Sequence, residues 1–153
     1  MQTALDAGGA AAFFPTRRVR RAWSDRTKTI TEPLFPGYVF CRMSRGERRR
    51  RLQVAGVIDA VGFGGRPEPI DDEEIESLRT LTRSGVDLAE VTRLTPGERV
   101  RVVDGPLAGA SGILEKIRNR RRLIVRVSIL QRAVGAEVDA GCVERVALAG
   151  AGR

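Results

Sequence analysis

The sequence lacks histidine altogether and has only two cysteines, Cys41 and Cys142, in 153 residues. The absence of histidine excludes serine–histidine and cysteine–histidine catalysis, the HExxH metalloprotease motif and histidine-ligated zinc. The two cysteines form no CxxC motif, so they indicate neither a metal site nor a redox pair. We expect them to be small core residues in a reducing compartment. The sequence thus predicts no metal, no cofactor and no enzymatic activity.

Long hydrophobic runs are also missing. No apolar stretch approaches the roughly 18 residues of a membrane-spanning helix, and residues 1–12 lack the basic start and apolar run of a signal peptide. We therefore expect a cytoplasmic protein without a membrane partner.

Lysine is scarce in a chain that is strongly basic. Only Lys28 and Lys116 are lysines among 27 Lys and Arg residues, which face 19 acidic residues and give a formal net charge of +8. Such a charge favours polyanions or acidic protein surfaces as partners. Arginine suits bidentate contacts to phosphate or carboxylate, although a codon bias toward arginine explains the composition equally well.

The arginines gather in three runs, and for each run a solvated basic face is the alternative to a binding site. Four consecutive arginines on a helix point to all of its sides, so residues 48–51 cannot all serve one surface. The runs are Arg17, Arg18, Arg20 and Arg21; Arg45 with Arg48, Arg49, Arg50 and Arg51; and Arg118, Arg120, Arg121 and Arg122.

The clearest local signal is a helix over residues 71–83. Asp71 is expected to cap it, with Glu74 closing a capping box and Ile70 packing on Ile75. Gly85 marks its end. The buried side is expected to carry Ile75, Leu78 and either Leu81 or Thr82.

Strands and helices alternate before this helix, whereas β segments follow it. Residues 38–43 predict a central strand, residues 47–54 a short helix and residues 57–63 another strand. From residue 96 onward, short β segments recur roughly every 10 to 12 residues between turn signals, as in a small all-β barrel. The predicted α+β organisation is a domain over residues 1–85, a linker over 86–95, a β-barrel over 96–148 and a frayed tail over 149–153.

Two motifs in this order resemble the NusG family. Residues 33–40 (PLFPGYVF), the strand over 57–63 and residues 66–70 before the capped helix resemble the NusG N-terminal domain, while residues 97–114 resemble the KOW motif that follows it. Residues 23–34 look more like operon-specific UpxY or RfaH paralogues. The resemblance implies a ferredoxin-like α/β domain followed by an SH3-like β-barrel. The KOW motif positions are Val100, Val102, Gly105, Pro106, Gly109 and Gly112.

The resemblance also implies a transcription elongation or antitermination factor. Such a factor binds the clamp helices of RNA polymerase and bridges the DNA channel toward the opposing lobe, which reduces pausing or termination. The clamp-binding patch maps onto Phe35, Pro36, Gly37, Tyr38 and Phe40. A Pro36-Gly37 turn is expected to leave Phe35 and Tyr38 partly exposed, the alternative being that the aromatic residues belong to the core.

Nucleic-acid and further protein partners are implied in the same way. DNA near the transcription bubble is expected to meet Arg17, Arg18, Arg20, Arg21, Arg48 and Arg49. The KOW loop over 105–112 contacts a ribosomal protein or Rho in the family, but Ala110 stands where an aromatic residue is common. This loop lacks the Lys-Ser/Thr ending of a phosphate-binding loop. The alternative function is that of an RNA-binding or ribosome-associated KOW protein.

The start of the chain departs from the family pattern. NusG proteins open with a strand that is central in their sheet, followed by a full helix, whereas this chain begins near the latter part of that helix. Without the first strand, two strand edges would lack partners. We therefore expect that the true start lies upstream of Met1, the alternatives being that another segment fills the gap or that the domain is unstable.

Overall fold

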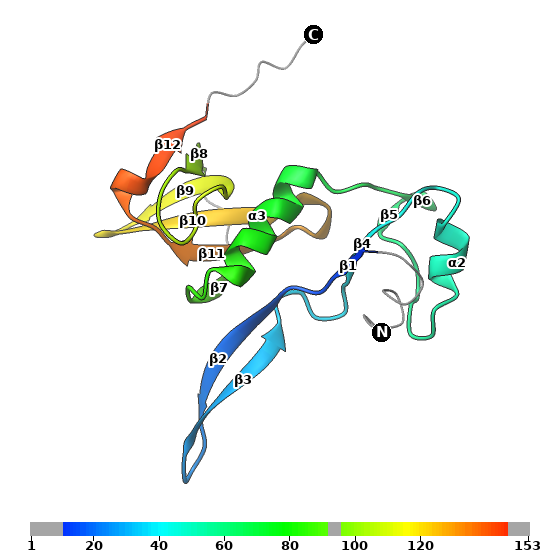
Figure 1. The fold of residues 1–153 in the computed structure, drawn as a ribbon, viewed down its shortest axis with the longest axis horizontal. Coiled ribbons are helices and arrows are strands. Elements are labelled where there is room, and N and C mark those ends of the chain that lie inside the picture. The colour runs from blue at the N-terminus through cyan, green and yellow to red at the C-terminus, as the bar shows by residue number, and fades with distance from the viewer. Residues whose placement is uncertain (1–10, 92–95, 147–153) are drawn as a thin grey trace. The chain divides into compact units, whose positions relative to one another are not determined.

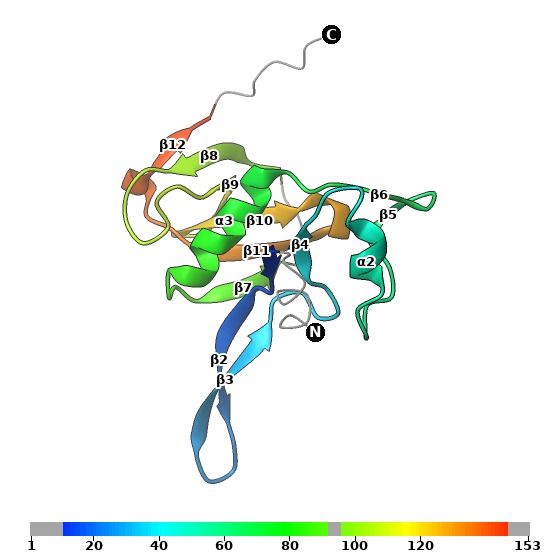
Figure 2. The same ribbon diagram turned by 45° about the vertical axis from the view of Figure 1, so that its right-hand side comes forward.

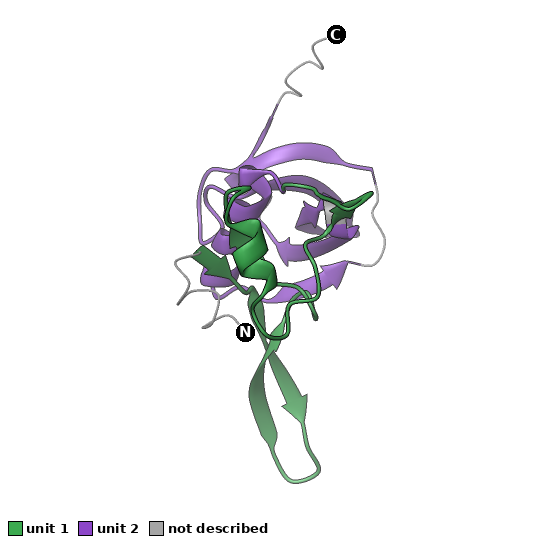
Figure 3. Cartoon of the chain, turned by 90° about the vertical axis from the view of Figure 1, so that its right-hand side faces the viewer, with its two compact units in different colours: residues 1–69 green, residues 70–153 purple. Residues whose placement is uncertain are grey.

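The computed structural model describes residues 11–91 and 96–146, except for the side chain of Ile129. The chain divides into two compact units, residues 1–69 and residues 70–153 (Figure 3). The tail predicted over 149–153 and the start of the chain lie outside the described residues.

In its described residues, 11–69, unit 1 has three antiparallel strand pairs and one short helix (Figure 1). The pairs are β1 (Ala11–Phe13) with β4 (Phe40–Arg42), β2 (Thr16–Ala22) with β3 (Thr27–Pro33), and β5 (Gly62–Phe63) with β6 (Arg66–Pro67). The helix is α2 (Arg48–Leu52), within the segment predicted for it.

The β2–β3 hairpin is the longest strand pair of unit 1, and Figures 1 and 2 show it as an extended two-stranded ribbon. Its register runs from Thr16 opposite Pro33 to Ala22 opposite Thr27. Threonines alternate along β3, and such β-branched residues favour the pleated conformation. The amide of Leu34 donates to the carbonyl of Pro15 at 2.9 Å and so joins the base of the ribbon to the core of unit 1.

An aromatic cluster forms that core. Phe40 packs edge-on against Phe35, with ring centroids 5.8 Å apart, and lies 6.0 Å from the ring of Phe13. Phe35 and Leu34 are almost completely buried. Cys41 is only half-buried, as is Cys142 in unit 2, and both are free thiols rather than the core residues that we expected.

Two strands predicted for unit 1 differ in the structure. The segment 38–43 pairs with one neighbour, β1, and only over residues 40–42, so it is not a central strand among the described residues. Of the predicted strand 57–63, only residues 62–63 are extended and paired, and Ile58 is 99% exposed. A strand needs a neighbour for its backbone groups, and the described part of unit 1 places none beside residues 57–60, whereas the carbonyl of Val61 accepts a hydrogen bond from the amide of Glu68 at 3.1 Å. These residues consequently do not form a ferredoxin-like sheet.

Unit 2 is built on a six-stranded antiparallel sheet with the strand order β12-β8-β9-β10-β11-β7. Its strands are β7 (Leu88–Val91), β8 (Glu98–Val102), β9 (Ser111–Ile117), β10 (Arg120–Val127), β11 (Arg132–Glu137) and β12 (Val143–Arg145), with 3-10 turns η1 (Ser128–Leu130) and η2 (Ala140–Cys142). Strand β7 pairs with β11 and lies within the predicted linker 86–95. Residues beyond 96 supply the other strands, in agreement with the predicted change to β structure.

The helix α3 (Asp72–Arg83) confirms the prediction for residues 71–83 and lies against β9 and β10 (Figure 2). Leu78 and Leu81 are fully buried, as the apolar spacing predicts. Gly85 follows with φ of +73°, a value that favours glycine at a helix end. By contact, α3 groups with the sheet of unit 2, whereas the sequence placed it in the first domain.

The acidic start of α3 faces the sheet instead of capping the helix. Asp71 makes no side-chain capping hydrogen bond, and the carboxylate of Glu74 accepts hydrogen bonds from the amide and hydroxyl of Ser128, so the predicted capping box is wrong. Glu73 pairs with Arg99 and Arg101 of β8. Near the middle of the helix, the Ser111 amide donates to the Ser77 hydroxyl at 2.9 Å.

Glu73 should make the contact between α3 and the sheet dependent on pH. A hydrogen bond from Ser111 is the largest cause that lowers the pKa of Glu73 below its ordinary 4.5, and Arg99 and Arg101 lower it further. A lowered pKa in the folded state stabilises the protein above the unfolded-state pKa, and this stabilisation is lost as pH falls through the folded-state value. We expect Glu73→Gln to lower the melting temperature at neutral pH, and the gap to the parent protein to close below about pH 4.5.

The matched control is Glu76→Gln, because Glu76 is exposed and pairs with Arg79 of the same helix. Such a surface pair contributes little, so this variant should melt close to the parent. An equal loss in both variants, or a loss that persists unchanged at low pH, would contradict the role given to Glu73.

Candidate nucleic-acid and protein-binding surfaces

The four arginines of the first run lie in two pairs on opposite faces of the β2–β3 hairpin. Successive side chains of a strand point to opposite faces, so Arg17 and Arg21 share one face. Glu32 lies opposite Arg17 and accepts hydrogen bonds from its Nε and Nη2 at 2.9 and 2.7 Å, and from Arg21 Nη2 at 3.1 Å. Hydrogen bonds from Arg17 and then Arg21 lower the pKa of Glu32. These two arginines are thus largely occupied within the hairpin.

Arg18 and Arg20 occupy the other face, opposite Thr31 and Thr29. Both are exposed, and neither has an ion pair among the described residues. Residues two apart on a strand are separated by about 7 Å, close to the rise along the helix axis of two successive phosphates of one duplex strand. This face of the hairpin therefore presents two available guanidinium groups to a polyanion.

Trp23 lies at the tip of the same hairpin, where its amide donates to the carbonyl of Arg26 at 2.7 Å. Its side chain is 60% exposed, which is unusual for the largest apolar residue. The sequence prediction did not include it among the site residues. The signal that could have identified it is the chain's lone tryptophan, placed in a polar turn that follows a basic strand.

The arginines of the second run, on α2, point to different sides of the helix and have different surroundings, as helical geometry requires. Arg51 is buried and pairs with Glu47 at 3.4 Å, while Arg48 is half-buried and lies 3.8 Å from Asp59. Arg49 is exposed, with no ion pair in the described part of the chain. Of the two residues predicted here for nucleic acid, Arg49 is the better placed, because Arg48 already faces a carboxylate.

The predicted polymerase-binding segment forms a tight turn on the aromatic core. The Tyr38 amide donates to the carbonyl of Phe35 at 3.1 Å, and Gly37 has φ of +86°, which side chains rarely adopt. Pro36 and Gly37 are exposed and Tyr38 is half-buried. Phe35, however, is only 2% exposed. The expectation that Phe35 is partly exposed is wrong, because its ring fills the space beside Phe40.

Phe40 is also buried, at 8% exposure. This burial agrees with the alternative that Phe40 belongs to the core. The surface of the segment is thus made by Pro36, Gly37 and Tyr38, supported from below by the two phenylalanine rings.

The KOW positions separate into core and turn residues. Val100 and Val102 are buried, and the loop closes where Gly109 N donates to Val102 O and Val102 N to Ala110 O, both at 2.9 Å. Gly105 and Gly109 have φ of +83° and +92°, so the interpretation of this loop as glycine turns, rather than a phosphate-binding loop, is consistent with its geometry. Ala110 is fully buried, and Pro106 is exposed.

Gly112 has a different role. A Cβ atom on it would lie 2.3 Å from the carbonyl oxygen of Ile124, so only glycine fits at this position. In the described ranges, no group of three or more potential metal ligands is found, and no helix has the length and apolarity needed to span a membrane.

Comparison with known proteins identifies the family. Residues 1–79 match the family model described as "NusG: Transcription termination factor nusG". The chain belongs to the NusG family. The match to this NusG model extends into α3, whose contacts are with the sheet of unit 2.

Curated NusG relatives resemble most of the chain. The transcription termination/antitermination protein NusG of Escherichia coli strain K12 is 35% identical over 137 residues, which cover 86% of this chain and 75% of that protein. NusG of Pseudomonas aeruginosa is 33% identical over 139 residues, which cover 86% and 77%. A solved structure described as "Domain interaction in Thermotoga maritima NusG" has 25% identity and a TM-score of 0.46, and covers 95% of this chain and 86% of that one.

The chain is accordingly a NusG-like transcription termination/antitermination factor and not an enzyme. An N-terminal NusG domain precedes a β-rich C-terminal region, as the motif order predicted.

The pairing of the hairpin arginines gives a direct test. We expect Arg18→Ala/Arg20→Ala to weaken binding to a DNA duplex and to reduce the slope of log affinity against log salt by about 2, since each phosphate contact contributes about 0.9. The matched variant Arg17→Ala/Arg21→Ala removes the same charge but should reduce the slope by less, because Glu32 already engages both residues. Filter binding at several salt concentrations measures both. Equal changes in slope would show that only net charge matters.

Proposed function

We propose that this NusG-family chain is an elongation/antitermination factor that binds the clamp helices of RNA polymerase in the cytoplasm and bridges the DNA channel toward the opposing lobe. The observation that carries the proposal is the Pro36-Gly37-Tyr38 turn, held on a buried pair of aromatic rings. A rigid exposed turn with one half-buried tyrosine has the features of an interface anchor, because it loses little conformational freedom on binding. Phe35 and Phe40 act in this proposal by positioning the turn.

The exposed arginines supply the second contact of the proposal. Arg18 and Arg20 on the hairpin, and Arg49 on α2, face DNA near the transcription bubble. The guanidinium group of arginine can donate two parallel hydrogen bonds to a phosphate, and such a contact requires no particular base sequence. This contact uses part of the basic excess of unit 1 and requires no sequence-specific recognition.

The proposed effect on pausing or termination follows from differential affinity. A protein shifts a conformational equilibrium only by the difference in its affinity for the two states. A factor that contacts both sides of the channel binds a closed clamp better than an open one, and so favours continued elongation. No bond needs to be made or broken by the factor.

The C-terminal region completes the proposal as an SH3-like KOW barrel. Its loop over 105–112 is the proposed contact for a ribosomal protein or Rho. Because Ala110 is fully buried, this contact would use the exposed Pro106 rather than an aromatic side chain.

Tyr38→Ala tests the polymerase contact. We expect the affinity for isolated clamp helices to fall at least about thirtyfold, since an anchor residue at an interface typically costs about 2 kcal/mol or more when truncated. Isothermal titration with a clamp-helix fragment measures this without nucleic acid. Melting of the variant is recorded beside binding, because Tyr38 is half-buried.

Two further variants make the outcome decisive. Pro36→Glu adds a charge at an exposed position of the same turn and leaves the aromatic core intact, so it should also weaken binding. Trp23→Ala removes an exposed aromatic residue away from the turn and should not. If Pro36→Glu and a folded Tyr38→Ala both bind like the parent, the turn is not the polymerase-binding surface.

A further inference from the structure

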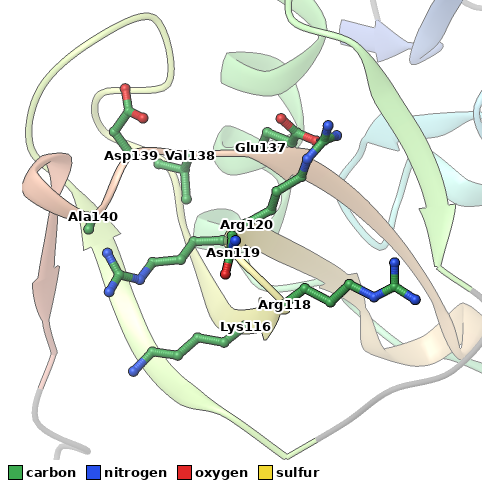
Figure 4. Close-up of a pocket in the computed structure, with 9 residues that line it drawn as sticks. Lys116, Arg118, Asn119, Arg120, Glu137, Val138, Asp139 and Ala140 are labelled. Carbon is green, nitrogen blue, oxygen red and sulfur yellow. The ribbon is translucent and has the colours of Figure 1, made fainter.

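A basic pocket of about 640 Å³ lies in unit 2, at the tip of the β9–β10 hairpin and beside the segment that connects β11 to η2 (Figure 4). Its volume is in the range of ligand-binding pockets, but its lining is dominated by charged side chains. The cationic residues that line it are Lys116, Arg118, Arg120 and Arg121, and the acidic residues are Glu137 and Asp139. Nothing in the proposed function uses this third arginine run.

The ion pairs within the pocket leave an excess of positive charge. Arg120 Nη1 contacts Glu137 Oε1 at 2.7 Å, and Figure 4 shows these two side chains meeting at one side of the pocket. Lys116, Arg118 and Arg121 have no ion pair within the described part of the chain. With Asp139 as the remaining acid, the pocket retains two more positive than negative side chains.

Lys116 and Arg121 are directly opposite each other in the β9–β10 register. Directly opposed like charges on neighbouring strands destabilise a sheet. A bound anion would lie between the two and offset this repulsion. On an ordinary solvated face, neighbouring strands bring opposite charges together, as Arg120 and Glu137 do here. Two like charges directly opposite each other depart from that arrangement.

Arg118 occupies the turn of the hairpin with φ of +53°. Glycine or asparagine adopts this conformation readily, whereas an arginine is strained there. The turn thus carries a guanidinium group at a position where backbone geometry alone favours a smaller residue. Figure 4 shows the Arg118 side chain extending from the tip of the hairpin.

We propose that this pocket binds the phosphodiester backbone of a single-stranded nucleic acid. Arginine forks and a lysine recognise phosphate oxygens of either RNA or DNA. A concave site admits the phosphates of a flexible strand, whereas those of a duplex lie on a convex surface. Residues 70–153 contain no aromatic side chain on which bases could stack. The affinity of the pocket should therefore depend on phosphate charge and not on base sequence.

The test uses the full chain and amide NMR spectra, because the unit 1 arginines also attract nucleic acid. Oligouridylate and oligothymidylate of about ten nucleotides serve as probes. We expect the amide signals of Asn119, Val138 and Ala140, which line the pocket, to shift on titration with either probe. A larger response to a duplex than to both single strands, or no shift of these amides, would overturn the proposal.

A charge-matched pair of triple variants gives the second readout. Lys116→Gln/Arg118→Gly/Arg121→Gln removes the three unpaired cations, and glycine suits the positive φ at residue 118. Arg126→Gln/Arg132→Gln/Arg145→Gln removes three cations elsewhere on the same sheet. We expect the pocket variant to bind about tenfold more weakly and to reduce the salt slope by about 2, since single strands contribute about 0.7 per contact.

The pocket variant should also melt no lower than the parent, because it removes the Lys116–Arg121 repulsion. The control variant should bind nearly as well as the parent. Equal losses of affinity in both variants would show a general charge effect and overturn the pocket as a site, whatever the result of the Tyr38 and Pro36 tests on polymerase.

Discussion

Strand β10 is hydrogen-bonded to β9 on one side and to β11 on the other, and the rest of unit 2 depends on this double pairing. Its consecutive residues Leu123, Ile124 and Val125 are all buried, so the strand is covered on both faces. Gly112 lets β9 approach β10 closely, because a Cβ atom there would collide with the Ile124 carbonyl. The helix α3 contacts these two strands, and the basic pocket lies where they turn into one another.

Carboxylates decide which arginines are available for partners. Nearly all cations of the chain are arginines and therefore chemically alike, so their roles are set by what lies opposite them. Glu32, Glu47 and Glu73 each hold arginines within the fold. Cations without such a partner in the described structure include three groups: Arg18 and Arg20; Arg49; and Lys116, Arg118 and Arg121. Each group lies on a hairpin or a helix surface where a polyanion can reach it.

The aromatic residues are arranged in a complementary way. The only tyrosine and tryptophan of the chain are both in unit 1. There the phenylalanines of the core hold the turn at residues 36–38, while Trp23 stays exposed at the tip of the β2–β3 hairpin. Unit 2, which lacks aromatic residues, offers charge and backbone turns only. This division fits the two proposals, in which unit 1 binds a protein through an anchor side chain and both units bind phosphates through charge.

Local sequence determined the features that depend on near neighbours along the chain: α3, the glycine turns of the KOW loop, the β-rich second half, the order of the NusG motifs and the lack of catalytic chemistry. These features follow from the spacing of the apolar residues, the φ values that glycine prefers and the types of side chain that the chain contains. Tertiary structure alone decided which members of each arginine run lack an ion pair, that Phe35 is buried, that Glu74 faces Ser128 instead of capping α3, and that residues 57–60 have no strand beside them. Each of these outcomes depends on a group that is distant in sequence, such as Glu32 for Arg17 or Phe40 for Phe35, and the free energy of such a contact has no signature in the local pattern.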